Sequence, residues 1–196
     1  MKWFQPIECD NTVDDPLVCD HSNFEKLGYD ENDFRKGKRI SRWNSKVFLQ
    51  AKEKADDGDP DDALQNSYML PIYSQRLVDA LKEEKISGIQ YLPVRILRPN
   101  KREIKGFSIA NFLNFVAAFN YEKSDYDRFK EDFPNINVRG KLAGVKKFVL
   151  HEKELGGLDI IRLKDYNLRF FFSENVKKVF EDNKFTGYSF IEVELT

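Results

Sequence analysis

The chain has 196 residues, of which 41% are hydrophobic and 17 are phenylalanine, so it is long and apolar enough to bury a core. Its 32 Lys and Arg residues nearly balance 33 Asp and Glu residues, which argues against a dedicated nucleic-acid-binding protein, a class that is usually strongly basic. The start "MKWFQPIECD" lacks the apolar run of a secretory signal, and no window reaches the roughly 20 apolar residues of a membrane span. With Cys9 and Cys19 outside any metal or redox spacing, we expect a cytoplasmic protein with reduced thiols.

The first 65 residues are predicted to form an irregular N-terminal lobe. Residues 2–4 could open a strand, residues 24–40 read as loop with a short helical piece, and the spacing of apolar residues in Ser45–Ala55 weakly predicts a helix. Residues 56–66 form a polar loop and mark the boundary with a core of residues 66–196.

Residues 73–97 predict a helix followed by a strand. Ser74 is a good N-cap because its hydroxyl can accept a hydrogen bond from the first turn, and Gly88 ends the helical region. One apolar stripe runs along the helix at Leu77, Ala80 and Leu81. The following strand, 89–97, contains Pro93, which cannot donate a ladder hydrogen bond and therefore predicts an edge position or a bulge.

The middle of the chain is less regular. Residues 104–109 are expected to return as the second strand of a hairpin, whereas 111–129 fits a helix or a strand with a turn equally well. Residues 146–152 and 158–164 flank Gly156-Gly157 and predict a second hairpin.

The end of the chain repeats the earlier pattern, because residues 172–190 align without a gap with residues 73–91. Ser173 takes the place of the N-cap, and Gly187 the place of the stop. The apolar stripe consists of Val176, Val179 and Phe180. Either an internal pseudo-repeat or convergence on a common helix–turn–strand pattern explains the match. The predicted fold is one compact α+β domain, with helices packed on a largely antiparallel sheet.

No catalytic motif stands out in the sequence. His21 lies near Cys19 and Asp20 and could join a metal site with Asp10, Asp14 and Asp15, although a polar loop explains these residues as well. The run "DDGDPDD" resembles a Ca²⁺ loop but lacks the acidic residue at position twelve of an EF-hand. It fits a solvated loop, or a negative surface for a basic partner. "RKGKRISRW" (35–43) could contact phosphate and stack a base, or be a basic surface segment with Trp43 in the core.

A series of short motifs is spread over about residues 66–194. Its residues are Leu70, Pro71, Ser74, Ile89, Gln90, Pro93, Ser124, Arg162, Leu163, Ser173, Glu174, Thr186 and Gly187. This series resembles one protein family, the bacterial immunity proteins of polymorphic toxin systems, long carried as a domain of unknown function. Asn120 departs from the family pattern, which more often has Asp at that position.

The resemblance implies a non-catalytic protein that binds and neutralises a cognate toxin and needs no cofactor or metal. If the toxin is basic, local charge predicts that an acidic cluster contacts it, namely Asp56, Asp57, Asp59, Asp61 and Asp62. Two other functions remain open from the residues alone. One is a metal-dependent enzyme of unrecognised type, and the other is a nucleic-acid-binding regulator that uses Arg35 to Arg42.

Overall fold

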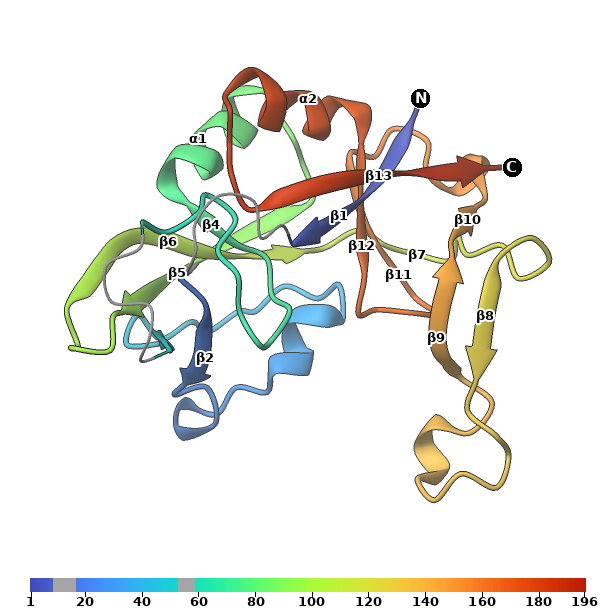
Figure 1. Ribbon diagram of the computed structural model, residues 1–196, viewed down its shortest axis with the longest axis horizontal. Coiled ribbons are helices and arrows are strands. Elements are labelled where there is room, and N and C mark those ends of the chain that lie inside the picture. The colour runs from blue at the N-terminus through green and yellow to red at the C-terminus, as the bar shows by residue number, and fades with distance from the viewer. Residues whose placement is uncertain (9–16, 53–58) are drawn as a thin grey trace.

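The protein is built mainly from β-strands, as its computed structural model shows (Figure 1). The structure describes residues 1–8, 17–52 and 59–196, and over these residues it has thirteen strands in three sheets. The α-helices within this part of the chain are α1 (Gln75–Glu83) and α2 (Glu174–Asp182), each nine residues long. The predicted α+β class is therefore wrong, and the fold is β-rich.

A six-stranded sheet contains both ends of the chain. Its order is β10-β13-β1-β12-β11-β7. The strands are β1 (Trp3–Glu8), β7 (Phe115–Val116), β10 (Val149–Leu150), β11 (Ile160–Leu163), β12 (Phe170–Ser173) and β13 (Tyr188–Leu195). The first strand is an interior strand, since Trp3 is in antiparallel register with Ser173 on one side and Val193 on the other.

A five-stranded sheet has the order β2-β3-β5-β6-β4. Its strands are β2 (Cys19–Ser22), β3 (Phe48–Ala51), β4 (Ile72–Ser74), β5 (Ile89–Leu97) and β6 (Glu103–Phe112). The expected hairpin of β5 and β6 is confirmed, and its ladder has a bulge between Val94 and Ile96, next to Pro93. Strand β3 pairs with β5 only from Arg95 onward, so the missing N–H of Pro93 leaves no gap in that ladder.

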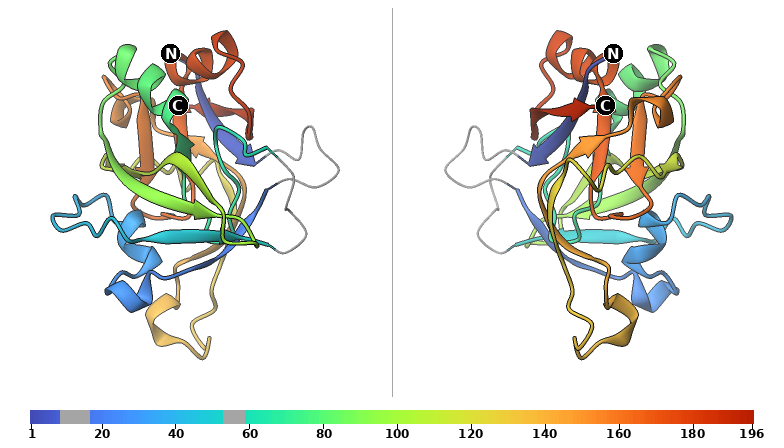
Figure 2. Two further views of the ribbon diagram at one scale, coloured as in Figure 1. Left: turned by 90° about the vertical axis from the view of Figure 1, so that its left-hand side faces the viewer. Right: turned by 90° about the vertical axis from the view of Figure 1, so that its right-hand side faces the viewer.

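The third sheet is a hairpin that projects from the body of the molecule (Figures 1 and 2). It consists of β8 (Asp125–Arg128) and β9 (Leu142–Lys147), and a 3₁₀-helix, η3 (Ile136–Val138), lies between them in the chain. Among the described strands, β8 and β9 form a sheet only with each other. We call residues 121–147 the arm.

The two similar sequence stretches adopt the same arrangement. In each, two mutually parallel strands linked by a helix lie on either side of a third, antiparallel strand: β4 and β5 flank β6, while β12 and β13 flank β1. The third strand follows directly in the first unit but comes from the chain's N-terminus in the second. Helices α1 and α2 lie side by side on the same side of the molecule (Figure 1).

The same hydrogen bonds hold both helix starts. The Ser74 hydroxyl donates to Asp62 Oδ1 over 2.7 Å, and the Ser173 hydroxyl donates to Asp159 Oδ1 over 2.7 Å. Only Ser74 also accepts a hydrogen bond from its helix, from the Leu77 N–H at 3.2 Å. Ser173 occupies the N-cap position without a capping hydrogen bond, so its predicted capping role is wrong.

Three buried clusters make up the core. One fills the space under the five-stranded sheet and includes Phe24 and Phe34. The second joins both helices to both large sheets through Phe112 and Phe172. The third covers the other side of the six-stranded sheet and reaches the base of the arm at Phe119. Because the second cluster draws on both sheets, burial of its aromatic side chains holds the two sheets together.

The N-terminal region is not an irregular lobe. Its described residues supply β1, β2, β3 and two 3₁₀-helices, η1 (Glu25–Leu27) and η2 (Glu31–Arg35). The helix predicted for Ser45–Ala55 is the strand β3, whose residues Leu49 and Ala51 are buried while Phe48 and Gln50 are partly exposed. This alternation has the period of two that a strand requires.

The predicted hairpin around Gly156-Gly157 is also wrong. Strands β10 and β11 belong to one sheet, but three strands separate them, and a short 3₁₀-helix, η4 (Glu152–Glu154), precedes the glycines. Strand β10 pairs with β13, and β11 pairs with β12 and β7. Residues 111–129, which fitted two structures equally well, contain the end of β6 and all of β7 and β8.

Candidate functional site

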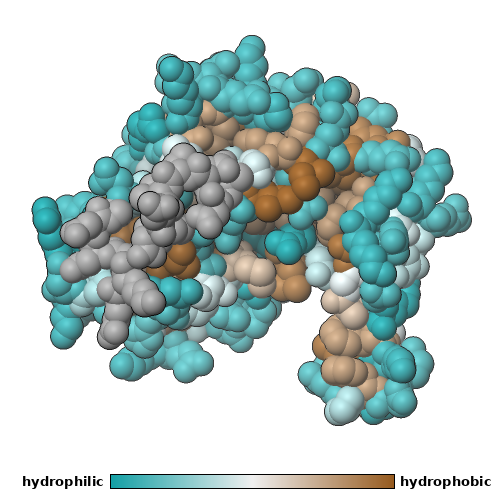
Figure 3. All heavy atoms as spheres, viewed as in Figure 1, coloured by the Kyte–Doolittle hydropathy of each residue, from teal (hydrophilic) through white to brown (hydrophobic). Residues whose placement is uncertain are grey.

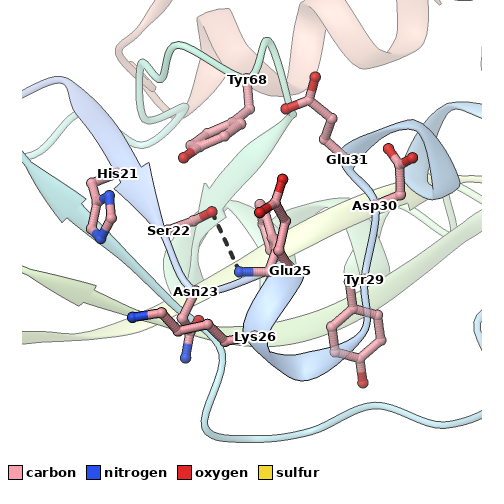
Figure 4. A pocket seen from close by; sticks show the side chains of 10 residues that line it. His21, Ser22, Asn23, Glu25, Lys26, Tyr29, Asp30, Glu31 and Tyr68 are labelled. Carbon is pink, nitrogen blue, oxygen red and sulfur yellow. Dashed lines mark hydrogen bonds between the residues drawn. The ribbon is translucent and has the colours of Figure 1, made fainter.

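A surface cavity of about 540 Å³ opens beside β2, η1 and η2. Three carboxylates, from Glu25, Asp30 and Glu31, lie toward one side of it, and His21 and Lys26 lie on the other (Figure 4). Most of these charged side chains are exposed. Water therefore screens them, and the cavity suits weak polar contacts with a partner better than chemistry that needs a desolvated group.

Local hydrogen bonds shape this cavity. Gly28 takes a positive φ of 80° to end η1, and its N–H donates to the Glu25 carbonyl. Asp30 begins η2 with a reciprocal cap: its carboxylate accepts from the Asn32 N–H at 2.8 Å, and the Asp33 carboxylate accepts from the Asp30 N–H at 3.2 Å. The Asp30 carboxylate is thus partly used within the fold.

Of the candidate metal residues, the structure describes Cys19, Asp20 and His21. Cys19 is buried, and burial raises the pKa of its thiol to about 12, with Asp20 adding to the shift, so the thiol stays protonated at neutral pH. The His21 side chain faces the surface cavity instead (Figure 4). Asp10, Asp14 and Asp15 lie outside the described residues. Within the described residues, no group of three or more His, Cys, Asp or Glu side chains is placed to hold a metal ion.

The acidic cluster divides into residues with different surroundings. Asp62 is 8% exposed and pairs with Arg76 at 2.5 Å, and its carboxylate also accepts from the Thr186 N–H at 3.2 Å. Asp62 therefore links the first helix–strand unit, through Arg76, to the second, through Thr186. Asp61 is partly buried, which raises the pKa of its carboxyl, whereas Asp59 is exposed. Asp56 and Asp57 lie outside the described residues.

The basic segment is partly built into the fold. Arg35 is buried and donates to the Tyr68 carbonyl. The Trp43 indole N–H donates to the Pro93 carbonyl at 2.8 Å, and its ring lies against Tyr29 with centroids 4.9 Å apart. Both groups therefore serve packing, which leaves Lys36, Lys38, Arg39 and Arg42 as the exposed charges of this segment.

Sequence reasoning missed the role of Arg162 in β11. The side chain is fully buried, its guanidinium lies 5.7 and 5.3 Å from the ring centroids of Phe112 and Phe170, and one N–H donates to the Asn167 carbonyl at 2.6 Å. Burial, followed by the nearby Arg35, lowers the pKa of Arg162 to about 10. A buried cation is costly, and this one is stabilised by ring faces rather than by a carboxylate of the described residues.

Sequence reasoning also missed an exposed apolar group on the arm. Of the large apolar side chains that are exposed in the described part of the chain, Tyr121, Phe133 and Ile136 all belong to the arm. The only signal in the sequence was the stretch "FPNIN", where apolar residues alternate with turn-forming ones.

Comparison with known proteins gives one match. A model for a family described as "Immunity protein family (Imm11)" matches residues 4–195, which is nearly the whole chain. No curated protein sequence matches it. The match includes β1 and the basic segment, both of which lie outside the region in which the short motifs were found. Among the described residues, no helix is long and apolar enough to cross a membrane.

Proposed function

Because the chain belongs to the Imm11 immunity protein family, we propose that it neutralises a cognate bacterial toxin by binding it directly in the cytoplasm. The family match carries this proposal. Inhibition by binding requires a stable scaffold and a surface that fits one partner, and it requires no chemical step.

The placement of the ionisable groups supports binding rather than catalysis. The groups with the most shifted pKa values are Cys19, Tyr73, Tyr91, Arg162 and Tyr188, and burial is the main cause of each shift. Cys19 and Arg162 lie in the cores rather than around the 540 Å³ cavity. In an enzyme, such groups tend to line the cavity where substrate binds.

Neutralisation is tested by expressing the toxin encoded next to this protein, with and without it. We expect growth to be rescued and the purified proteins to form a complex of fixed stoichiometry, measured by light scattering after gel filtration. Rescue without a complex would contradict binding as the mechanism. Failure of both rescue and binding would overturn the proposed function.

We propose that Asp56, Asp57 and Asp59, with a smaller contribution from the partly buried Asp61, steer a basic toxin toward the protein. Charges of one sign raise association rates by attracting the partner over about one Debye length. Asp62 is left out, because its carboxylate is engaged with Arg76 inside the fold.

This steering is tested by changing Asp56, Asp57 and Asp59 together to Lys. We expect the association rate constant at low salt to fall by about tenfold, with little change in dissociation, and the difference to shrink at high salt. The matched control reverses Glu83, Glu152 and Glu154, three exposed carboxylates outside both the acidic cluster and the arm. If the triple variant associates with the toxin at the wild-type rate, the acidic cluster does not steer the toxin.

A further inference from the structure

The arm lies outside the two large sheets. Its strands are anchored at the base, where Phe119 of the third core cluster meets Tyr121 and Tyr126, with ring centroids 4.9 and 5.6 Å apart. Beyond that base, the arm extends away from the body of the molecule in both views (Figures 1 and 2). The tip therefore contributes little to the core, and packing gives no reason for its apolar side chains.

The tip nevertheless carries apolar side chains in a defined arrangement. Phe133 is 39% exposed and Ile136 is 71% exposed, and the ring of Phe133 lies 4.8 Å from that of Phe129. The Arg139 side chain donates to the Phe133 carbonyl at 2.7 Å, which fixes the loop. In the space-filling view, apolar residues gather at the end of the arm with polar residues around them (Figure 3). Such a rimmed apolar group is typical of an interaction site.

The shaft of the arm carries a second ordered group. The Arg128 guanidinium lies over the rings of Tyr121 and Tyr126, 5.1 and 5.2 Å from their centroids, and donates to the Gly140 carbonyl at 2.6 Å. Tyr and Arg are the residues that most often dominate protein–protein binding energy. Because Arg128 is already held in place, less side-chain entropy is lost when a partner binds.

We propose that the arm inserts into a concave, apolar recess of the toxin, with acidic groups at the rim of that recess. This inference rests on the proposed function and names the surface that performs it. A projecting tip can bury Phe133 and Ile136 only against a hollow, and so the partner surface must be concave. The acidic rim follows from charge, since residues 128–141 contain four basic and two acidic side chains.

The test measures toxin affinity for a double variant, Phe133→Asp with Ile136→Asp, and for Arg128→Met. Residues at the centre of an interface cost about 2 kcal/mol or more when they are lost, so we expect the double variant to bind at least on the order of 30-fold more weakly. Arg128→Met should weaken binding less and reduce its dependence on salt. The double variant should keep the wild-type melting temperature, because Phe133 and Ile136 lie outside the core clusters.

The matched control is Ile191→Asp. Ile191 is 54% exposed on β13, away from the arm, and its replacement should leave affinity unchanged. If the wild-type protein binds the toxin and the double variant binds equally well, the arm inference is wrong while the proposed function stands. If the wild-type protein fails to bind, the proposed function itself is wrong. If the wild-type protein is a dimer and the double variant is a monomer, a second copy of the chain occupies the tip. That result also overturns the inference.

Discussion

At the scale of single residues, two aspartates play equivalent parts with different partners. Asp62 and Asp159 each accept a hydrogen bond from the serine before a helix. Asp62 is buried and binds the cationic Arg76, whereas Asp159 is partly exposed and binds the neutral amide of Asn175. Loss of the buried Asp62 carboxylate breaks an ion pair, whereas loss of the partly exposed Asp159 carboxylate breaks hydrogen bonds to neutral groups. The first loss is expected to cost more stability.

We therefore predict that Asp62→Ala lowers the free energy of unfolding by about 2 kcal/mol, the scale of a lost hydrogen-bonded charge, and Asp159→Ala by about 1 kcal/mol. Urea denaturation of both variants, monitored by circular dichroism, provides the measurement. Equal losses would contradict the view that burial and the ion pair with Arg76 distinguish the two sites.

The buried thiol of Cys19 makes stability dependent on alkaline pH. Its pKa is about 12 in the folded chain against an ordinary value of 9.0, and a protonated thiol is favoured by burial. Folding raises the pKa of the thiol. Its contribution to the free energy of unfolding is therefore complete below about pH 9 and is lost as the pH rises toward 12.

Urea denaturation at pH 8 and pH 10.5 tests this in a Cys9→Ala background, which leaves one thiol. We predict that the Cys19 thiol accounts for about 2 kcal/mol of the stability lost between the two pH values. The further variant Cys19→Ala is the control, since tyrosines that are buried in the folded chain titrate near their ordinary pKa once it unfolds, and this contribution is common to both proteins. A pH dependence that Cys19→Ala leaves unchanged would refute the assignment.

At the scale of elements, the loop after each helix depends on a glycine. Gly88 and Gly187 both have positive φ, of 78° and 101°. A Cβ at Gly187 would overlap the carbonyl oxygen of Ala63, whereas one at Gly88 would overlap the side-chain amide of Asn114. Backbone cannot move aside as a side chain can, so Gly187 is the less replaceable of the two.

We predict that Gly187→Ala destabilises the protein by about 3 kcal/mol or more, because strain and overlap add. Gly156→Ala is the control, since a Cβ there meets no atom within 4 Å. Thermal unfolding of the two variants is the measurement, and a melting temperature of Gly187→Ala equal to that of Gly156→Ala would contradict the prediction.

Local signals predicted some elements well and others badly. The strand at 89–97 and both helices follow from apolar stripes and glycines, and the first helix also from its Ser74 cap, and these signals act within a few residues. The strand β3 was mistaken for a helix because its four residues are too few for periodicity to decide, and its pairing with β2 and β5 decides instead. The failed hairpin has the same cause, because β10 pairs with the distant β13.

At the scale of the whole molecule, the N-terminal region joins both large sheets. Strand β1 lies between β12 and β13, and β3 lies beside β5. We therefore propose that residues 1–196 form one domain, in which residues 1–65 and 66–196 depend on each other.

We predict that a fragment of residues 66–196 lacks a cooperative thermal transition, because losing β1 leaves β12 and β13 with unpaired edges and exposes their apolar side chains. The full chain is the control, and differential scanning calorimetry is the measurement. A fragment that melts cooperatively near the temperature of the full chain would refute the single domain.

The candidate sites show the same division between local and distant information. The charge of the acidic cluster could be read from the sequence, but the removal of Asp62 from the surface could not, since Arg76 and Thr186 reach it from two different units. The arm could not be anticipated either, because its exposure depends on β8 and β9 pairing only with each other among the described strands.

By itself, the sequence determined the two helices, the strands that follow them and the short motifs that resemble the immunity family, because apolar spacing, glycines and local hydrogen bonding act within a few residues. Only the tertiary structure decided which strands pair, that the first strand lies inside a sheet, and which charged and apolar side chains remain exposed. Those outcomes depend on contacts between residues far apart in the chain, such as Trp3 with Val193 and Asp62 with Thr186, which no local pattern specifies.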